Sequence, residues 1–102
     1  MIISSVAGFR EGADQAVYAG TKHAQFGLAG ALDRELRERS MRVTLNCPAV
    51  TAAEFVVGAG RVAVDPRSAD WLSQTDVAAA IVTALRQPRT VRTSIWTVWD
   101  MG

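Results

Sequence analysis

Apolar and polar residues follow one another in blocks along the chain, and three of the apolar blocks predict β-strands. Residues 1–4 are apolar with two adjacent isoleucines, a composition typical of a buried strand. Residues 41–46 (MRVTLN) form a second block that Pro48 is expected to stop. Residues 91–98, rich in β-branched and aromatic side chains, predict a third strand.

A long helix is predicted over residues 15–39, which contain good helix formers and no proline. Its leucines recur at every fourth position and predict an apolar stripe: Leu28, Leu32 and Leu36. Three glycines interrupt it: Gly20, Gly27 and Gly30. Since each glycine costs about 1 kcal/mol relative to alanine in a helix interior, we expect them to allow close packing against another backbone.

A second helix is predicted over residues 76–87 (DVAAAIVTALRQ), and Pro88 is expected to end it. Ser73, followed three positions later by Asp76, resembles a capping box at its start. Gly8, Gly12 and the polar residues between them predict a loop after the first strand.

The elements alternate as strand, helix, strand, helix, strand. Right-handed crossovers of this kind build a parallel sheet with helices on its faces. The predicted fold class is therefore α/β, with three parallel strands and two main helices. A chain of 102 residues allows one domain at most. Residues 49–72 are mixed, with a possible helical turn near 52–57.

Charge and composition narrow the function classes. The chain is 49% hydrophobic and 21% charged with a formal net charge of +1, which gives no field that would attract nucleic acid or anionic lipid. Acidic residues interleave with the arginines at the end of the long helix, and i,i+4 pairs are expected between Asp33 and Arg37 and between Glu35 and Arg39. We interpret this segment as a solvated, salt-bridged face rather than a nucleic-acid patch.

The chain has one cysteine, Cys47, and one histidine, His23. A disulfide framework within the chain and a structural zinc site are therefore excluded, and no metal site is predicted. The first residues do not read as a signal peptide, and the most apolar stretch, residues 47–60, is too short to span a bilayer. We expect a cytoplasmic protein in which Cys47 is a small buried filler.

The candidate chemistry lies in three residues. Tyr18 and Lys22 are one helical turn apart, so their side chains share a face of the long helix. An ammonium about 4 Å from a phenolate stabilises it by roughly 4 kcal/mol at an effective dielectric near 20. Such a tyrosine can exchange a proton with a carbonyl oxygen. Ser5, at the end of the first strand, can hydrogen-bond the same oxygen.

These residues also allow other interpretations. A Tyr-x-x-x-Lys pair alone occurs often by chance, and its specificity comes from the strand that ends at Ser5 and the strand that ends at Pro48. A serine hydrolase using Ser5 and His23 is weaker, because the chain has no G-x-S-x-G elbow and His23 points about 100° away from Lys22 around the helix. We therefore expect His23 to be a surface or interface residue.

Three segments resemble the C-terminal, catalytic half of a short-chain dehydrogenase/reductase: ISSVAG, VYAGTKHAQFGLAGALDRELRERSMRVTLNCPA and TDVAAAIVTALRQPRTVR. The resemblance covers nearly the whole chain, least clearly at residues 56–72. It implies the C-terminal part of a Rossmann-like doubly wound sheet. It also implies an oxidoreductase that transfers a hydride between NAD or NADP and a small carbonyl or alcohol substrate.

The resemblance also assigns roles to individual residues. Tyr18 would be the catalytic acid/base, Ser5 the ligand of the substrate oxygen, and Lys22 the residue that holds the nicotinamide ribose and assists the tyrosine. The nicotinamide pocket would be lined by the residues at the end of the second strand: Pro48, Ala49, Val50 and Thr51. The long helix 15–39 would pair with its symmetry mate in a homodimer or homotetramer.

The chain departs from the family pattern at two positions. Pro48 is followed by Ala49 where the family usually has glycine, and the usual threonine five residues after the proline falls at Ala53. The glycine-rich turn that binds the pyrophosphate is missing, since Gly58 and Gly60 follow no convincing strand. We therefore expect residues 1–102 to be a partial domain that lacks the dinucleotide-binding half.

An alternative function is a non-catalytic remnant or a dimerisation module that relies on the long helix. The substrate itself cannot be read from the sequence. Residues 49–72 are expected to form a lid, and its large side chains indicate an apolar pocket: Phe55, Val56, Val57 and Trp71. Trp96 and Trp99 are expected in the core or in the substrate wall.

Overall fold

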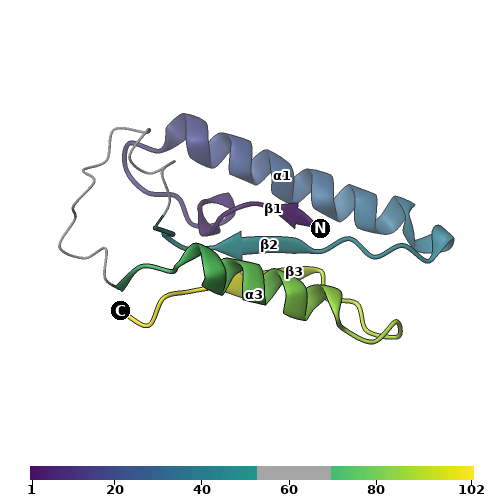
Figure 1. Cartoon of the computed structure of the whole chain (residues 1–102). Coiled ribbons are helices and arrows are strands. Elements are labelled where there is room, and N and C mark those ends of the chain that lie inside the picture. Colours follow the sequence, from purple (N-terminus) through teal and green to yellow (C-terminus); the bar gives the residue numbers. More distant parts are fainter. Residues whose placement is uncertain (53–69) are drawn as a thin grey trace.

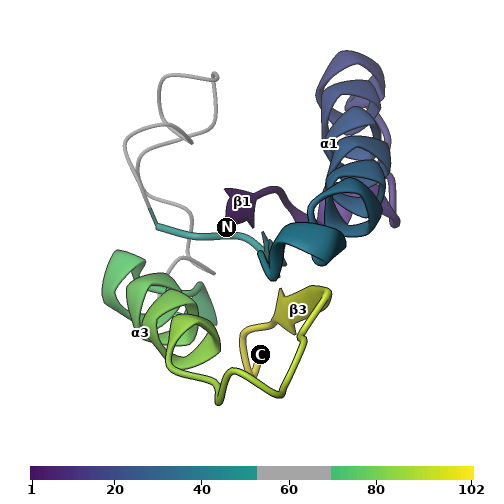
Figure 2. The same ribbon diagram turned by 90° about the vertical axis from the view of Figure 1, so that its right-hand side faces the viewer.

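The computed structural model describes residues 1–52 and 70–102, and Figure 1 shows its layers. Three parallel strands form one sheet in the order β1 (Ile2–Ile3), β2 (Leu45–Pro48) and β3 (Ile95–Val98). Helix α1 (Ala16–Glu35) and helix α3 (Gln74–Leu85) lie on opposite sides of the sheet (Figure 2). Two short 3-10 helices, Val6–Gly8 and Arg37–Arg39, flank α1. The predicted α/β class with a parallel sheet is confirmed.

Strand β2 differs from its prediction at both ends, because it runs from Leu45 to Pro48 rather than over residues 41–46. The backbone amides of Leu45 and Ala49 donate toward β3, at 2.9 and 2.8 Å from their acceptors. Residue 48 therefore faces the β1 side, and β1 has already ended at Ile3. The missing N–H of Pro48 thus costs no ladder hydrogen bond, so a proline is tolerated inside this strand.

Only the second half of the predicted third strand is strand in the structure, since β3 begins at Ile95. The residues before it are held by side chains of the segment that precedes β2. Thr44 Oγ1 donates to the Thr93 carbonyl at 2.7 Å, and Arg42 Nη1 donates to the Val91 carbonyl at 2.9 Å. These bonds take the place of ladder pairing at Val91 and Thr93, and backbone pairing begins where the Ser94 carbonyl accepts from the Leu45 amide.

The face of α1 that packs on the sheet is not the predicted leucine stripe. Leu32 and Leu36 pack against the core, but Leu28 is 54% exposed. A step of four residues advances about 400° around a helix, so a strict i+4 series drifts by about 40° per step. The core face instead consists of the buried Ala19, Ala29 and Asp33 together with Phe26, Leu32 and Leu36, which pack against the core.

The core between α1 and the sheet consists of Ala29, Val43, Leu45 and Cys47. The last three alternate along the segment that leads into and through β2, so their side chains point to the same side of the sheet. Leu45 is 1% exposed and Cys47 is fully buried. The prediction that Cys47 is a buried filler is therefore confirmed.

Helix α1 ends at Glu35, before the predicted end at residue 39, and residues 37–39 form a 3-10 turn. The chain leaves this turn through Ser40, which has a left-handed φ of 56°. The expected Asp33–Arg37 ion pair is present at 3.1 Å. The expected Glu35–Arg39 pair is not among the ion pairs within residues 1–52 and 70–102, because the α-helical i,i+4 geometry stops at Glu35.

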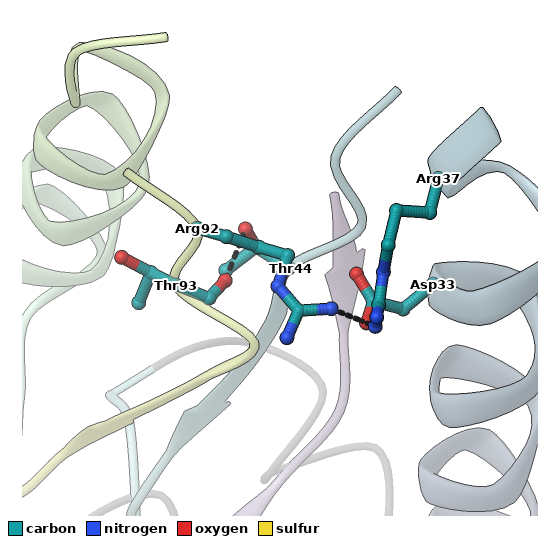
Figure 3. Close-up of polar contacts among 5 residues, drawn as sticks. All are labelled: Asp33, Arg37, Thr44, Arg92 and Thr93. Carbon is teal, nitrogen blue, oxygen red and sulfur yellow. Dashed lines mark hydrogen bonds and ion pairs between the residues drawn. The ribbon is translucent and has the colours of Figure 1, made fainter. Parts of the chain in front are cut away.

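A buried carboxylate ties α1 to the segment before β3 (Figure 3). Asp33 is 8% exposed, and its Oδ2 accepts from Arg92 Nη1 at 2.5 Å as well as from Arg37 Nη2 at 3.1 Å. Asp33 and Arg92 are 59 positions apart in the chain. The contact fixes the angle of α1 against the far edge of the sheet.

Helix α3 begins with the predicted capping box, although at Gln74 rather than at residue 76. The Asp76 amide donates to Ser73 Oγ at 3.1 Å, and the Ser73 amide donates to Asp76 Oδ2 at 2.8 Å. The hydroxyl of Ser73 also donates to that carboxylate, and these bonds lower the pKa of Asp76.

This capping box predicts a pH-dependent contribution to stability. A carboxylate whose pKa is lower in the folded state stabilises the fold above its unfolded pKa, and this contribution is lost as pH falls through the folded pKa. We therefore expect Ser73→Ala to destabilise the chain at neutral pH and to have a smaller effect once Asp76 is protonated. Urea unfolding of both proteins at neutral and acidic pH measures this difference. A difference that stays constant across the carboxylate range would contradict the assignment.

Residues 53–69 lie outside the described part of the chain, and so do the predictions that concern them. These are most of the helical turn near 52–57, Ala53 as the family's threonine position, and the lid residues Phe55, Val56 and Val57. Among the residues that the structure does describe, no helix is long and apolar enough to cross a membrane.

Candidate active site

The candidate site lies where the chain leaves β1. Ser5 is 9% exposed and caps the 3-10 helix Val6–Gly8, because its Oγ accepts a hydrogen bond from the Ala7 amide at 3.1 Å. The preceding Ser4 is also buried, and its Oγ donates to the Lys22 carbonyl at 3.3 Å. The two serines thus have different tasks: Ser4 ties the strand end to α1, and Ser5 shapes the turn.

Gly8 allows this turn to pack directly on α1. A Cβ atom at position 8 would lie 3.0 Å from the Lys22 carbonyl oxygen and 3.0 Å from Phe26 Cδ2. Both distances are shorter than ordinary van der Waals contact, and one of the atoms belongs to the rigid helix backbone. Glycine is therefore required here for close approach, which brings the Ser5 turn against the Lys22 turn of the helix.

Tyr18 and Lys22 lie one turn apart on α1, as predicted, and both are half-buried. The Lys22 ammonium lies over the Tyr18 ring, with Nζ 5.4 Å from the ring centroid. This is cation–π geometry. The positive charge is thus held beside the phenol by the helix, which fixes the spacing of the two Cα atoms.

The surroundings of Cys47 include groups from the end of β1 and from α1. Burial raises the pKa of its thiol, and two weaker effects oppose this: a hydrogen bond from the Ser5 backbone and the positive charge of Lys22. The end of β1 and the lysine of α1 therefore act on the same sulfur atom near the end of β2. A raised pKa keeps the thiol neutral at pH 7, which makes Cys47 a poor nucleophile.

The segment from Pro48 to Thr51 forms the next part of this edge, and all four of its residues are half-buried. The Ala49 amide donates to the Val98 carbonyl at 2.8 Å, and Thr51 Oγ1 donates to the Ala49 carbonyl at 3.1 Å. Thr51 also forms a parallel bridge with Leu72. The segment is thus held at the carboxyl end of the sheet, where parallel α/β sheets bind ligands.

His23 takes no part in this arrangement. Its side chain is exposed, and its Nδ1 lies 2.8 Å from the Ala19 carbonyl oxygen of the same helix. The Oγ of Ser5 is occupied by the Ala7 amide instead. The hydrogen bonds of these two side chains give no support to a serine hydrolase, and the expected surface position of His23 is confirmed.

An aromatic cluster beside the site was not predicted in this form. Phe9 contacts Phe26 and Trp99 edge to face, with ring centroids 5.9 and 6.5 Å apart. Trp99 is 45% exposed, and the Arg10 guanidinium lies 5.8 Å from the centroid of its ring. The only hint of this cluster in the sequence is that Phe9 and Arg10 directly follow the serine turn. Nothing near Trp99 in the sequence indicates that it contacts Phe9.

Within residues 1–52 and 70–102, no group of three or more His, Cys, Asp or Glu side chains could hold a metal ion. Ser5 and the Pro48–Thr51 segment follow β1 and lie at the end of β2, respectively, at the carboxyl end of the sheet. The Ser5 turn packs on α1 at Lys22, and the Lys22 ammonium lies over the Tyr18 ring. Hydroxyl, ammonium and phenol groups can hydrogen-bond an oxygen atom or exchange a proton with it.

The chain is similar to known proteins in both sequence and fold. Residues 1–61 match the model of a family described as short chain dehydrogenase. No curated protein sequence matches significantly. The fold is similar to that of a betaketoacyl-ACP reductase from Bacteroides thetaiotaomicron, with a TM-score of 0.72 and 24% identity over 97% of this chain and 38% of the other.

Two further structures have the same fold. Serine dehydrogenase from Escherichia coli gives a TM-score of 0.73 with 22% identity over 94% of this chain and 37% of the other. A 4-hydroxyisoleucine dehydrogenase complexed with NADH gives 0.78 with 22% identity over 96% of this chain and 44% of the other. The chain thus spans well under half the length of these structures.

Proposed function

This chain belongs to the short-chain dehydrogenase family, and from that premise we propose that it carries the catalytic residues of an oxidoreductase. The reaction transfers a hydride between NAD or NADP and a carbonyl or alcohol substrate. The observation that supports this most strongly is the close packing of the serine turn on α1 at Lys22, where Ser4 Oγ donates to the Lys22 carbonyl at 3.3 Å, with the Lys22 ammonium 5.4 Å from the centroid of the Tyr18 ring.

Ser5 is proposed to orient the substrate oxygen. Its Oγ accepts one hydrogen bond from the Ala7 amide, and a hydroxyl that accepts still has its own hydrogen to donate. Because the accepted bond fixes Oγ at the end of β1, the hydroxyl hydrogen is free to point toward a substrate oxygen at the sheet edge.

Tyr18 is proposed to move the proton. Its phenolic oxygen would protonate the carbonyl oxygen in reduction and take the proton from the alcohol in oxidation. Lys22 supports this role because it holds a positive charge over the Tyr18 ring, with Nζ 5.4 Å from the ring centroid.

The residues proposed to hold the nicotinamide end of the cofactor are Tyr18, Lys22, Pro48, Ala49, Val50 and Thr51. They fit this group, because the half-buried segment 48–51 is pinned by hydrogen bonds beside the lysine at the carboxyl end of β2. When bound, the nicotinamide supplies or accepts the hydride. The 4-hydroxyisoleucine dehydrogenase structure is a complex with NADH and a closed form of serine dehydrogenase is a complex with NADP+, so both cofactors are candidates.

Binding of the pyrophosphate needs a glycine-rich turn between a strand and a helix. The sequence offers no such turn, so we propose that activity requires a dinucleotide-binding half in addition to residues 1–102. We further propose a cytoplasmic location, because the buried thiol of Cys47 is compatible with a reducing compartment.

The test is an assay on the natural polypeptide that carries residues 1–102. The polypeptide is mixed with NADH or with NADPH and with each of a panel of aldehydes and ketones, and the loss of absorbance of the reduced nicotinamide is followed. We expect turnover with one of the two cofactors. Saturable binding of neither cofactor, together with no turnover, would contradict the proposal.

The exposed face of α1 supports a second proposal, a homodimer or homotetramer formed through this helix. Its residues are small or apolar and lie opposite the core face: Val17, Gly20, Ala24, Gly27, Leu28 and Ala31. Val17 is 83% exposed, and a Cβ at Gly20 or Gly27 would meet nothing within 4 Å. Such a face lets a second helix approach closely. If the chain pairs without binding a cofactor, it acts as a dimerisation module rather than an enzyme.

Gly27→Leu tests this pairing. Leucine favours helix by about 1 kcal/mol over glycine, and the open space at position 27 accommodates it, so the subunit fold is preserved. A leucine between two closely packed helices should weaken the dimer by about 10- to 100-fold. Sedimentation measures this, with Ala79→Leu on the exposed face of α3 as the control. Unchanged association of Gly27→Leu would contradict the interface.

A further inference from the structure

We propose that a cavity at the amino end of the sheet binds a small ligand that joins an anionic head to an apolar body. The cavity has a volume of about 460 Å³. Its lining includes Met1, Thr44 and Thr93, which precede β1, β2 and β3 respectively. It therefore lies at the opposite end of the sheet from Ser5 and Pro48, and Gln87 and Arg89 of the loop that follows α3 also line it.

The polar side chains that line the cavity are suited to binding an oxyanion. Arg42 and Arg89 both line it, together with Ser40 and Thr93, and no acidic side chain is among the lining residues. The ion pairs in the described part of the chain all involve Asp33, so neither of these arginines is neutralised there by a carboxylate. Guanidinium groups bind phosphate and carboxylate oxygens through paired N–H donors.

Arg42 is held in place before any ligand arrives. Its Nη1 lies 3.1, 2.8 and 2.9 Å from the carbonyl oxygens of Gln87, Pro88 and Val91. These bonds fix the guanidinium against the loop after α3, while Nε and Nη2 carry three further N–H donors. A cation whose orientation is already fixed loses little conformational entropy when it binds an anion.

The charge distribution favours the same ligand. Segments 33–42 and 86–93 meet at this end of the molecule and together contain seven arginines and three acidic residues, a formal charge of +4, whereas the whole chain carries +1. Of these seven arginines, Arg42 and Arg89 line the cavity, and Arg37 and Arg92 pair with Asp33. An anion is attracted to this end even though the protein as a whole is nearly neutral.

The lining is mainly polar but has a smaller apolar part. Met1, Ala84 and Leu85 form this part, and Leu85 is 59% exposed. The volume lies in the range of small-molecule sites, roughly 300–1,000 Å³, which is larger than a free phosphate requires. The chemistry therefore fits a phosphate or carboxylate joined to a hydrocarbon or aromatic group.

Titration of the ¹⁵N-labelled chain, followed by NMR, tests the proposal. The probes are phenyl phosphate, benzoate, inorganic phosphate and phenol. We expect saturable shifts of amides in residues 84–93 with phenyl phosphate or benzoate, and weaker binding of inorganic phosphate and of phenol. Which of the two stronger probes binds more tightly decides between a phosphate and a carboxylate head.

Arg89→Gln should weaken binding of the stronger probe by about 10-fold, because it removes a charge-assisted hydrogen bond. The control is Arg86→Gln, which makes the same charge change outside the cavity lining and should change affinity less than twofold. Thr93→Val, similar in shape, should weaken binding severalfold and serves as a second variant. Equal losses in the two arginine variants, or no saturable shifts with any probe, would overturn the proposal.

Discussion

Replacement of Tyr18 by phenylalanine is expected to lower the rate of hydride transfer by about 10²- to 10⁴-fold, the usual contribution of a positioned general acid or base. Phenylalanine keeps the ring over which the Lys22 ammonium lies, at 5.4 Å from the centroid. The aromatic ring and its place on α1 are therefore kept, and the variant lacks the phenolic hydroxyl that would exchange the proton. The measurement is the single-turnover rate at saturating cofactor, in the natural polypeptide that carries this chain.

Thr21→Val is the matched control for this variant. Thr21 lies on the same helix, is exposed, and donates its hydroxyl to the Tyr18 carbonyl at 2.7 Å. Its replacement removes a hydroxyl close to Tyr18 without touching the phenol, so we expect less than a twofold change. Full activity of Tyr18→Phe would show that another group moves the proton.

Leu45→Ala is expected to cost about 2–5 kcal/mol of unfolding free energy. Leu45 is 1% exposed at the start of β2, and it forms the core between the sheet and α1 together with Ala29, Val43 and Cys47. A domain of this size has about 5–15 kcal/mol in total, so the variant loses a large share of its stability. Urea unfolding measures the effect.

Leu85→Ala removes the same atoms from a side chain that is 59% exposed. We expect it to cost less than about 1 kcal/mol, because little apolar surface returns to water. Equal losses of unfolding free energy in Leu45→Ala and Leu85→Ala would contradict the assignment of Leu45 to the core that stabilises the fold.

Much of the fold could be predicted from the sequence because its signals are local. The alternation of β-branched runs with helix-forming runs predicted the parallel sheet, and Ser73 with Asp76 predicted the cap of α3. The error at Pro48 has a different origin. Whether a proline breaks a strand depends on which neighbouring strand its nitrogen faces. Here the direction is set by the hydrogen bonds of β2 on its two sides, from the Ser4 amide to the Asn46 carbonyl and from the Ala49 amide to the Val98 carbonyl.

The candidate site was predictable only in part. The spacing of Tyr18 and Lys22 placed them on one helical face, and parallel strands bring Ser5 and Pro48 to the same edge of the sheet. Contacts across long separations left no sequence signal. The Asp33–Arg92 pair and the Phe9–Trp99 contact depend on how α1 and β3 are finally packed.

The central claim is that Ser5 and Tyr18 act on one substrate oxygen, and a double-mutant cycle measures this most directly. Single-turnover rates are determined for the natural sequence, Ser5→Ala, Tyr18→Phe and the double variant. Groups that share one oxygen act as a unit, so their effects are strongly non-additive. We expect the double variant to be within a few-fold of Tyr18→Phe alone. Two losses that simply multiply would contradict a shared oxygen.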